Sequence, residues 1–300
     1  MKNGIKLPIL LLIGWATALT LPTKLPAFAK QQSASTPLVI QSTPVGIART
    51  EDSNDRQPVN IYAKPFNHKD TRPRIGIVVT GLGLSDAATE AAIQALPGGV
   101  TLAFAPYSAK LDSWITLAHA SGHEVLIDIP MEPNNFPPYD PGPKALLTSL
   151  STNDNLNRLD LALGQAIGYV GVMDFVGSPF TASRKHMLPI LNAINQRGLL
   201  YFDSGSSPGS TAPSLAQDLK MPFSTATLML DESASRQSID RKFTELEKQA
   251  KSEKQAIGIA SPFPVTFEKI SDWAILLRAR GFVLAPISAL SQKNKPVANQ

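Results

Sequence analysis

Three aspartates, Asp128, Asp174 and Asp203, stand at or near the ends of short apolar runs and are candidates for carboxylate chemistry. Two carboxylates that flank a glycosidic bond at the right separation can hydrolyse it. Carboxylate oxygens can also hold a hard cation such as Ca²⁺ or Mg²⁺. The sequence does not give the separation, so both chemistries stay open. So does a plainer alternative, because aspartate is a common turn and helix-cap residue after strands.

Other polar and aromatic residues stand at the same positions or in the loops that follow. Phe175 and Phe263 are candidates for stacking against a sugar ring, with core packing as the alternative. Glu132 lies between Met131 and Pro133 and has a structural alternative, in which it bonds a loop backbone. The predicted ligand cleft consists of Thr80, Gly81, Glu132, Phe175, Ser178, Ser204, Ser261 and Phe263.

Two short motifs are poor matches to known chemistry. Gly81 and Gly83 begin a dinucleotide-type glycine pattern, but the third position is Asp86, whose carboxylate would repel a pyrophosphate. Residues 205–209 match G-x-S-x-G, the nucleophile-elbow pattern. Pro208 follows the serine and has no N–H for an oxyanion hole, and no histidine follows residue 186. We therefore interpret this segment as a Ser/Gly/Pro loop over the cleft.

Strands and helices must alternate to position these residues. Apolar runs predict strands over 75–80, 101–105, 124–129, 171–174, 199–203, 225–230, 256–260 and 283–287. Helical patterns cover 85–96, 111–121, 153–167, 184–196, 236–253 and 267–280. Repeated strand–helix units indicate a parallel sheet, either open or closed into a barrel. The carboxyl ends of such strands are where sites form, so a shared polar cleft is expected there.

A series of short blocks runs in order from about Arg74 to Leu290. They are Gly83-Leu84, Thr101–Tyr107, Gly122–Leu126, Pro130–Pro133, Asp140–Pro143, Gly171-Val172, Gly177-Ser178, Phe180-Thr181, Phe202–Ser204, Ala256–Gly258 and Pro286–Leu290. In these blocks the chain resembles the divergent polysaccharide deacetylase family, distant relatives of the NodB-type carbohydrate esterases. The resemblance implies an α/β fold, a distorted (β/α) barrel of about seven parallel strands. It also implies an exported protein with a glycan-related role.

The resemblance further implies a metal site whose residues are changed in this chain. Relatives have an Asp-Asp pair at the place of Thr80-Gly81, and histidines at the places of Asp128, Phe175 and Ser261. Of these, only Asp128 keeps a metal-capable side chain, whereas a hydrolytic metal needs roughly three protein ligands and an open position for water. We expect no metal and no cofactor, and a glycan-binding or scaffolding role in the cell envelope. The alternative is a working hydrolase or deacetylase that uses Asp128, Asp174 and Asp203.

The four histidines offer little replacement for those ligands. His68 falls in a predicted linker, and His123 precedes its strand, which places it at the rim opposite the cleft. His119 is separated from His123 by Gly122, which ends the helix. His186 is the one histidine expected near the cleft, with an exposed or capping role as the alternative.

Residues 1–29 are predicted to be an export signal. Lys2 and Lys6 precede an apolar run, and Ala27-Phe-Ala29 matches a cleavage site; an uncleaved anchor is the alternative. A flexible linker is predicted over 30–71, the domain over 72–291 and a disordered tail over 292–300, in a periplasmic or secreted protein. We therefore expect no membrane span after signal cleavage.

Charge and cysteine content narrow the functional classes further. The export segment holds three of the 28 basic residues and none of the 24 acidic ones, so the rest of the chain is close to neutral. The sequence pI of about 9.2 therefore gives no reason to expect nucleic acid as a partner. The chain has no cysteine, which excludes thiol catalysis and thiolate metal sites. A glycan, such as peptidoglycan or another envelope polysaccharide, is the expected partner.

Overall fold

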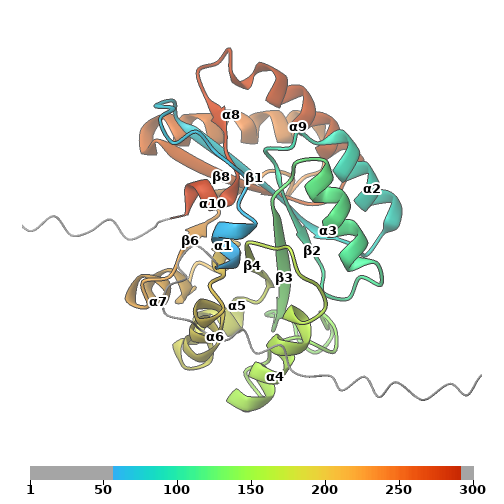
Figure 1. Cartoon of the computed structure of the whole chain (residues 1–300), viewed down its shortest axis with the longest axis vertical. Coiled ribbons are helices and arrows are strands. Elements are labelled where there is room, and N and C mark those ends of the chain that lie inside the picture. The colour runs from blue at the N-terminus through green and yellow to red at the C-terminus, as the bar shows by residue number, and fades with distance from the viewer. Residues whose placement is uncertain (1–56, 292–300) are drawn as a thin grey trace, which may run out of the picture. The chain divides into compact units, whose positions relative to one another are not determined.

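The computed structural model describes residues 57–291 (Figure 1). The predicted export signal, the predicted linker up to residue 56 and the predicted tail lie outside the described residues. None of the helices within 57–291 combines the length and the apolar character needed to cross a membrane.

The domain is built on a parallel sheet of nine strands. They are β1 (Arg74–Leu82), β2 (Thr101–Phe104), β3 (Val125–Met131), β4 (Gly171–Val176), β5 (Leu200–Asp203), β6 (Phe223–Thr225), β7 (Leu228–Met229), β8 (Gln255–Ala260) and β9 (Val283–Leu284). Their order is β6-β5-β4-β3-β2-β1-β8-β7, with β9 also paired to β1. Every pairing is parallel. The predicted α/β class is confirmed.

The ends of this order are joined by one short segment of chain. β6 pairs with β5 and β7 pairs with β8, although only Ala226 and Thr227 separate β6 from β7. The Ala226 N–H donates to the Asp203 carbonyl and the Thr227 N–H donates to the Ile257 carbonyl. The sheet therefore curls into a distorted barrel. The single strand predicted over 225–230 is divided because the chain changes partner strand in its middle.

Alternating side chains divide the interior into two cores. Val78, Leu126 and Met173 belong to a cluster inside the curl of the sheet. Ile77 and Ile127, each next to one of these in the chain, belong to the cluster shared with the surrounding helices. Successive residues of a strand point to opposite faces, so one step along β1, β3 or β4 moves a side chain from one core to the other.

Helices follow most strands and cover the outer face. They are α2 (Asp86–Ala95), α3 (Leu111–Ala120), α4 (Thr152–Leu163), α6 (Arg184–Gln196), α7 (Ala212–Asp218), α8 (Arg236–Glu253) and α9 (Pro264–Leu277). The hydroxyls of Ser85, Ser151 and Ser235 accept hydrogen bonds from the first turns of α2, α4 and α8, which fixes where these helices begin. The α5 helix (Ser178–Ala182) is a single short turn after β4.

The structure corrects the predicted start of the domain. Residues 57–71 were expected to belong to the linker, but they contain α1 (Pro58–Ile61), whose Val59 is buried in the inner core. The Lys64 N–H donates to the buried carboxylate of Glu124, and the Lys64 ammonium donates to the Gly122 carbonyl. With α10 (Ile287–Leu290), this segment fills the inside of the curled sheet at the amino ends of the strands (Figure 1).

Candidate functional site

Asp128 lies in the middle of β3 and, two residues after Leu126, faces the inside of the barrel. Its Oδ2 accepts hydrogen bonds from the Thr80 hydroxyl at 2.9 Å and from the Gly81 N–H at 2.8 Å. Gly81 has a φ of +75°, a conformation that glycine adopts without steric cost, and this turn aims its N–H at the carboxylate. Three of the predicted cleft residues therefore meet.

The second carboxylate oxygen of Asp128 differs from the first in its surroundings. Oδ1 is buried and has no hydrogen-bond partner within residues 57–291, and the residue is only 2% exposed. Burial disfavours the charged form and raises the pKa of Asp128 to about 6, although the bonds from Gly81 and Thr80 act in the opposite direction. A proton on Oδ1 would leave the bonds to Oδ2 in place.

Asp174 and Asp203 lie on the other face of the sheet. Asp174 pairs in register with Ile129, which belongs to the helix-side core, whereas its neighbour Met173 belongs to the inner core. Asp203 follows Phe202, another inner-core residue, and therefore also faces the helices. The structure brings these two carboxylates together and separates both from Asp128.

Both carboxylates of this pair are occupied by bonds from their own chain. Asp174 accepts the Ser204 N–H at 2.8 Å, the Ser204 hydroxyl at 2.5 Å and the Tyr201 hydroxyl at 3.1 Å. Asp203 accepts the Gly205 N–H at 2.8 Å and the Ser210 hydroxyl at 2.6 Å. They are 1% and 2% exposed. Their geometry is that of residues that order the 204–210 loop.

Burial raises the pKa of both residues in the pair. For Asp174 the charge of nearby Asp203 adds to this effect, while the bonds from Ser204 and Tyr201 oppose it. For Asp203 the bonds from Ser210 and Gly205 are the opposing influence. Burial likewise raises the pKa of Asp231, which accepts the Ser261 N–H and the Thr266 hydroxyl and so holds the β8–α9 turn.

The remaining predicted cleft residues take varied positions. Glu132 Oε2 accepts the N–H and the hydroxyl of Thr148, which is the loop-bonding role that the sequence left open. Phe175 is half-buried and faces the same side of the sheet as Asp128, while Phe263 is 42% exposed. Ser178 begins α5 and is half-buried.

A strained turn follows Phe175. Val176 has a φ of +59°, and Gly177 has a φ of +65°. The left-handed region is unfavourable for a β-branched side chain, so Val176 is a genuine outlier at the end of β4. A Cβ on Gly177 would lie 2.6 Å from the Met131 side chain, so this turn packs tightly against the end of β3.

These residues do not fit a hydrolytic metal ion. Among the described residues, no three His, Cys, Asp or Glu side chains form a group that could hold one. Inside the barrel mouth, Asp128 Oδ1 is a free carboxylate oxygen, and the neighbouring Thr80 hydroxyl is already engaged as a donor. A single oxygen falls short of the roughly three ligands that such a site requires.

The histidines lie away from this position or are engaged. His123 is buried at the amino end of β3, against the carbonyls of Val100 and Ile93, as the sequence predicts. His119 contacts the Gly168 carbonyl, and His186 contacts the Ser183 hydroxyl just before α6. His186 is half-buried and its ring bonds the Ser183 side chain, and α6 has no side-chain cap bond at Ser183, so His186 takes neither the exposed nor the capping role.

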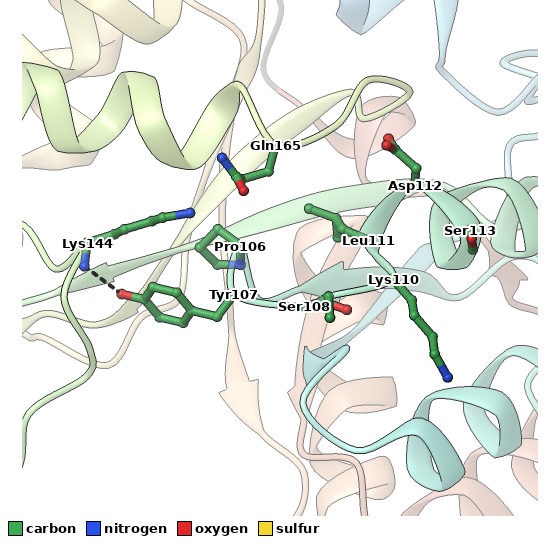
Figure 2. A pocket seen from close by; sticks show the side chains of 10 residues that line it. Pro106, Tyr107, Ser108, Lys110, Leu111, Asp112, Ser113, Lys144 and Gln165 are labelled. Carbon is green, nitrogen blue, oxygen red and sulfur yellow. Dashed lines mark hydrogen bonds between the residues drawn. The ribbon is translucent and has the colours of Figure 1, made fainter. Parts of the chain in front are cut away.

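A cavity of about 500 Å³ opens beside the barrel mouth (Figure 2). It is lined by the loop after β2, by the first turn of α3, and by Lys144 and Gln165. None of the four strand-end aspartates lines it. No local sequence pattern marks Tyr107 or Lys144 as a site residue, although Tyr107 ends one of the short blocks that carry the family resemblance.

Comparison with known proteins gives the chain its family. The sequence profile of the divergent polysaccharide deacetylases matches residues 77–291, which is most of the described domain. The chain belongs to the divergent polysaccharide deacetylase family. The resemblance read from the short sequence blocks is thereby confirmed.

Two bacterial proteins are similar to this chain over most of the domain. The uncharacterized protein YibQ of Escherichia coli is 27% identical over 194 residues, and an uncharacterized protein of Haemophilus influenzae is 25% identical over the same length. Each match covers 64% of this chain, and it covers 60% and 68% of those proteins. This chain therefore spans less than two thirds of the Escherichia coli relative.

A solved structure supports the fold assignment. The crystal structure of an uncharacterized protein from Agrobacterium tumefaciens is 37% identical and superposes with a TM-score of 0.76. The match covers 78% of this chain and 95% of that one.

Proposed function

We propose that this divergent polysaccharide deacetylase is an exported glycan-binding or scaffolding protein of the cell envelope, without metal-dependent deacetylation. The observation that supports this proposal is the closure of Asp128 onto Thr80 and Gly81. At the positions where the family resemblance implies metal ligands, the chain has a hydrogen-bonded carboxylate, a glycine turn, a half-buried phenylalanine and a serine. The glycan partner follows from the family, and export follows from the predicted signal in residues 1–29.

The proposal is tested by measuring binding and catalysis on the same polymer. Purified protein is incubated with insoluble peptidoglycan or with chitin, in the presence of Zn²⁺ or of a chelator. The expected result is co-sedimentation with at least one polymer in both conditions and no release of acetate. Acetate release that appears with Zn²⁺ and disappears with the chelator would overturn the proposal.

The second candidate is a hydrolase that uses the carboxylates directly. Its supporting observation is the raised pKa of Asp174 beside Asp203, because a carboxylic acid that keeps its proton near neutral pH can act as a general acid. Burial and the occupied oxygens of both residues weigh against it. Asp203→Asn discriminates between the two: the hydrolase requires loss of turnover in a folded variant, whereas a structural Asp203 predicts lower stability with unchanged glycan binding.

A further inference from the structure

The geometry points to the cavity beside Tyr107 as a binding site for an acidic saccharide, with Lys144 as the residue that receives its carboxylate. This inference rests on the proposed glycan-binding function and gives it a location and a ligand class. The cavity of about 500 Å³ falls in the range of small-ligand sites and has room for one or two sugar units. None of the strand-end aspartates lines this cavity, so the site does not depend on them.

Two contacts hold the cavity wall in place. The Tyr107 hydroxyl accepts a hydrogen bond from the Lys144 N–H at 3.0 Å. Gly142, with a φ of +113°, packs so closely on the tyrosine ring that a Cβ there would lie 2.8 Å from ring atoms. The loop that presents Lys144 is therefore fixed to the loop after β2, so little ordering is needed when a ligand binds.

The Lys144 side chain is positioned but unpaired. Its ammonium lies 5.7 Å from the centroid of the Tyr107 ring, a favourable cation–π separation. Within residues 57–291, no carboxylate lies within ion-pair distance of it. Figure 2 shows the ends of the Lys144 and Gln165 side chains above Pro106, and all three residues line the cavity. A carboxylate placed there would gain a charge-assisted hydrogen bond.

The rest of the lining selects a hydroxylated ligand over a simple anion. The Asp112 carboxylate has no partner within the described residues and would accept hydrogen bonds from sugar hydroxyls. Inorganic phosphate has fewer hydroxyls than a sugar to donate to this carboxylate. The Gln165 amide nitrogen donates to the Leu161 carbonyl at 2.8 Å, which leaves its carbonyl oxygen and its second N–H for a ligand. Pro106 and Leu111 are largely buried and form the wall of the cavity.

Calorimetric titration with defined probes tests this site in the full chain. The probes are the disaccharide of N-acetylglucosamine and N-acetylmuramic acid, which has a carboxylate, neutral chitobiose, and inorganic phosphate. The unsubstituted protein is expected to bind the acidic disaccharide more tightly than chitobiose. Lys144→Gln is expected to weaken acidic-disaccharide binding about three- to tenfold and to remove the preference, the range for a charge-assisted bond in a half-open site.

The matched control is Lys248→Gln, because Lys248 is an exposed lysine of α8 outside the cavity and should leave binding unchanged. Equal binding by the unsubstituted protein and Lys144→Gln, tighter binding of chitobiose, or competition by phosphate would overturn the inference. Co-sedimentation with peptidoglycan separates this result from the proposed function. If the protein sediments with the polymer and Lys144→Gln does not change disaccharide binding, the proposed function stands and the proposed site is wrong. If the protein binds no glycan, both proposals are wrong.

Discussion

The Thr80 hydroxyl donates a hydrogen bond to the Asp128 carboxylate over 2.9 Å and joins β1 to β3 inside the barrel. The Gly81 N–H binds the same oxygen. In this family member the two strands are thus linked directly through a buried side chain. The arrangement gives the carboxylate a structural role, and its energetic consequences can be measured.

Stability should depend on pH through Asp128. Its pKa is raised from 3.8 to about 6 by folding, so the folded state holds a proton that the unfolded state has already lost between about pH 4 and pH 6. Stability from this group is therefore full below pH 4 and is lost as the pH rises through 6. Asp128→Asn stays neutral at every pH and should be more stable than the unsubstituted protein above pH 6, by ~2–3 kcal/mol for a shift of this size.

Urea unfolding of both proteins at several pH values between 4 and 7 checks this prediction. Other buried acids contribute to both proteins equally, so the difference between the two curves isolates Asp128. A difference that does not change with pH would show that the carboxylate is not desolvated in the native state.

Ser204 should be a large contributor to the stability of the 204–210 loop. Ser204→Ala removes the hydroxyl that binds Asp174 at 2.5 Å and leaves a buried carboxylate oxygen without a partner. The expected loss in the free energy of unfolding is about 1–3 kcal/mol, as for a buried polar group left without its hydrogen-bond partner. Ser252→Ala, in the exposed last turn of α8, is the control and should change stability by less than about 0.5 kcal/mol. Equal effects of the two variants would contradict the assigned role.

Glu124 should hold the segment before β1 against the domain. Its carboxylate accepts the Ser288 N–H at 2.9 Å and the Lys64 N–H at 3.2 Å, and it also accepts the Ser288 hydroxyl. Glu124→Gln replaces one acceptor oxygen by a donor, so hydrogen–deuterium exchange should become faster over residues 57–66 and 287–291. Glu232→Gln, at an exposed position, should leave exchange there unchanged. Unaltered exchange in Glu124→Gln would show that apolar packing alone holds this segment.

The protein should become more stable when Val176 is replaced by glycine. A left-handed conformation costs a β-branched residue of order 1–3 kcal/mol, whereas glycine in a strand costs about 0.5–1 kcal/mol. Val176→Gly is therefore expected to raise the free energy of unfolding by about 0.5–1 kcal/mol. Val283→Gly, in the half-buried strand β9 with ordinary φ, should lower it by at least as much. Destabilisation of similar size in both variants would argue against strain at Val176.

Local patterns were sufficient to predict the helices and most strands. The α6 and α8 helices begin and end where predicted, because helix periodicity and helix ends depend on residues that are close in the sequence. Tertiary partners were not predictable in this way. The segment 225–230 changes partner strand in its middle. The predicted strand 283–287 ends early, because its last residue, Ile287, begins α10 and packs in the inner core. Residues 57–71 pack through Val59, which is buried in the inner core, and through Tyr62, Ala63 and Phe66, which are scattered without a helix or strand period.

The sequence predicts which residues belong to the candidate site better than it predicts which of them lie together. The aspartates predicted to share one cleft are all buried, but they occupy two faces of the sheet. Alternation contained that information, because Asp128 lies two residues from Leu126 whereas Asp174 follows Met173 directly. The same rule places Tyr201 on the face of Asp203. Contacts across loops, such as those of Ser210 with Asp203 and Tyr107 with Lys144, have no comparable local signal.

The most direct measurement of the central claim is acetate release from acetylated peptidoglycan, followed together with co-sedimentation, with added Zn²⁺ and with a chelator. A glycan-binding protein without a metal site predicts the same bound fraction in both conditions and no acetate in either. Acetate that forms only with Zn²⁺ would show that the residues around Asp128 assemble a working metal centre, and it would contradict the account.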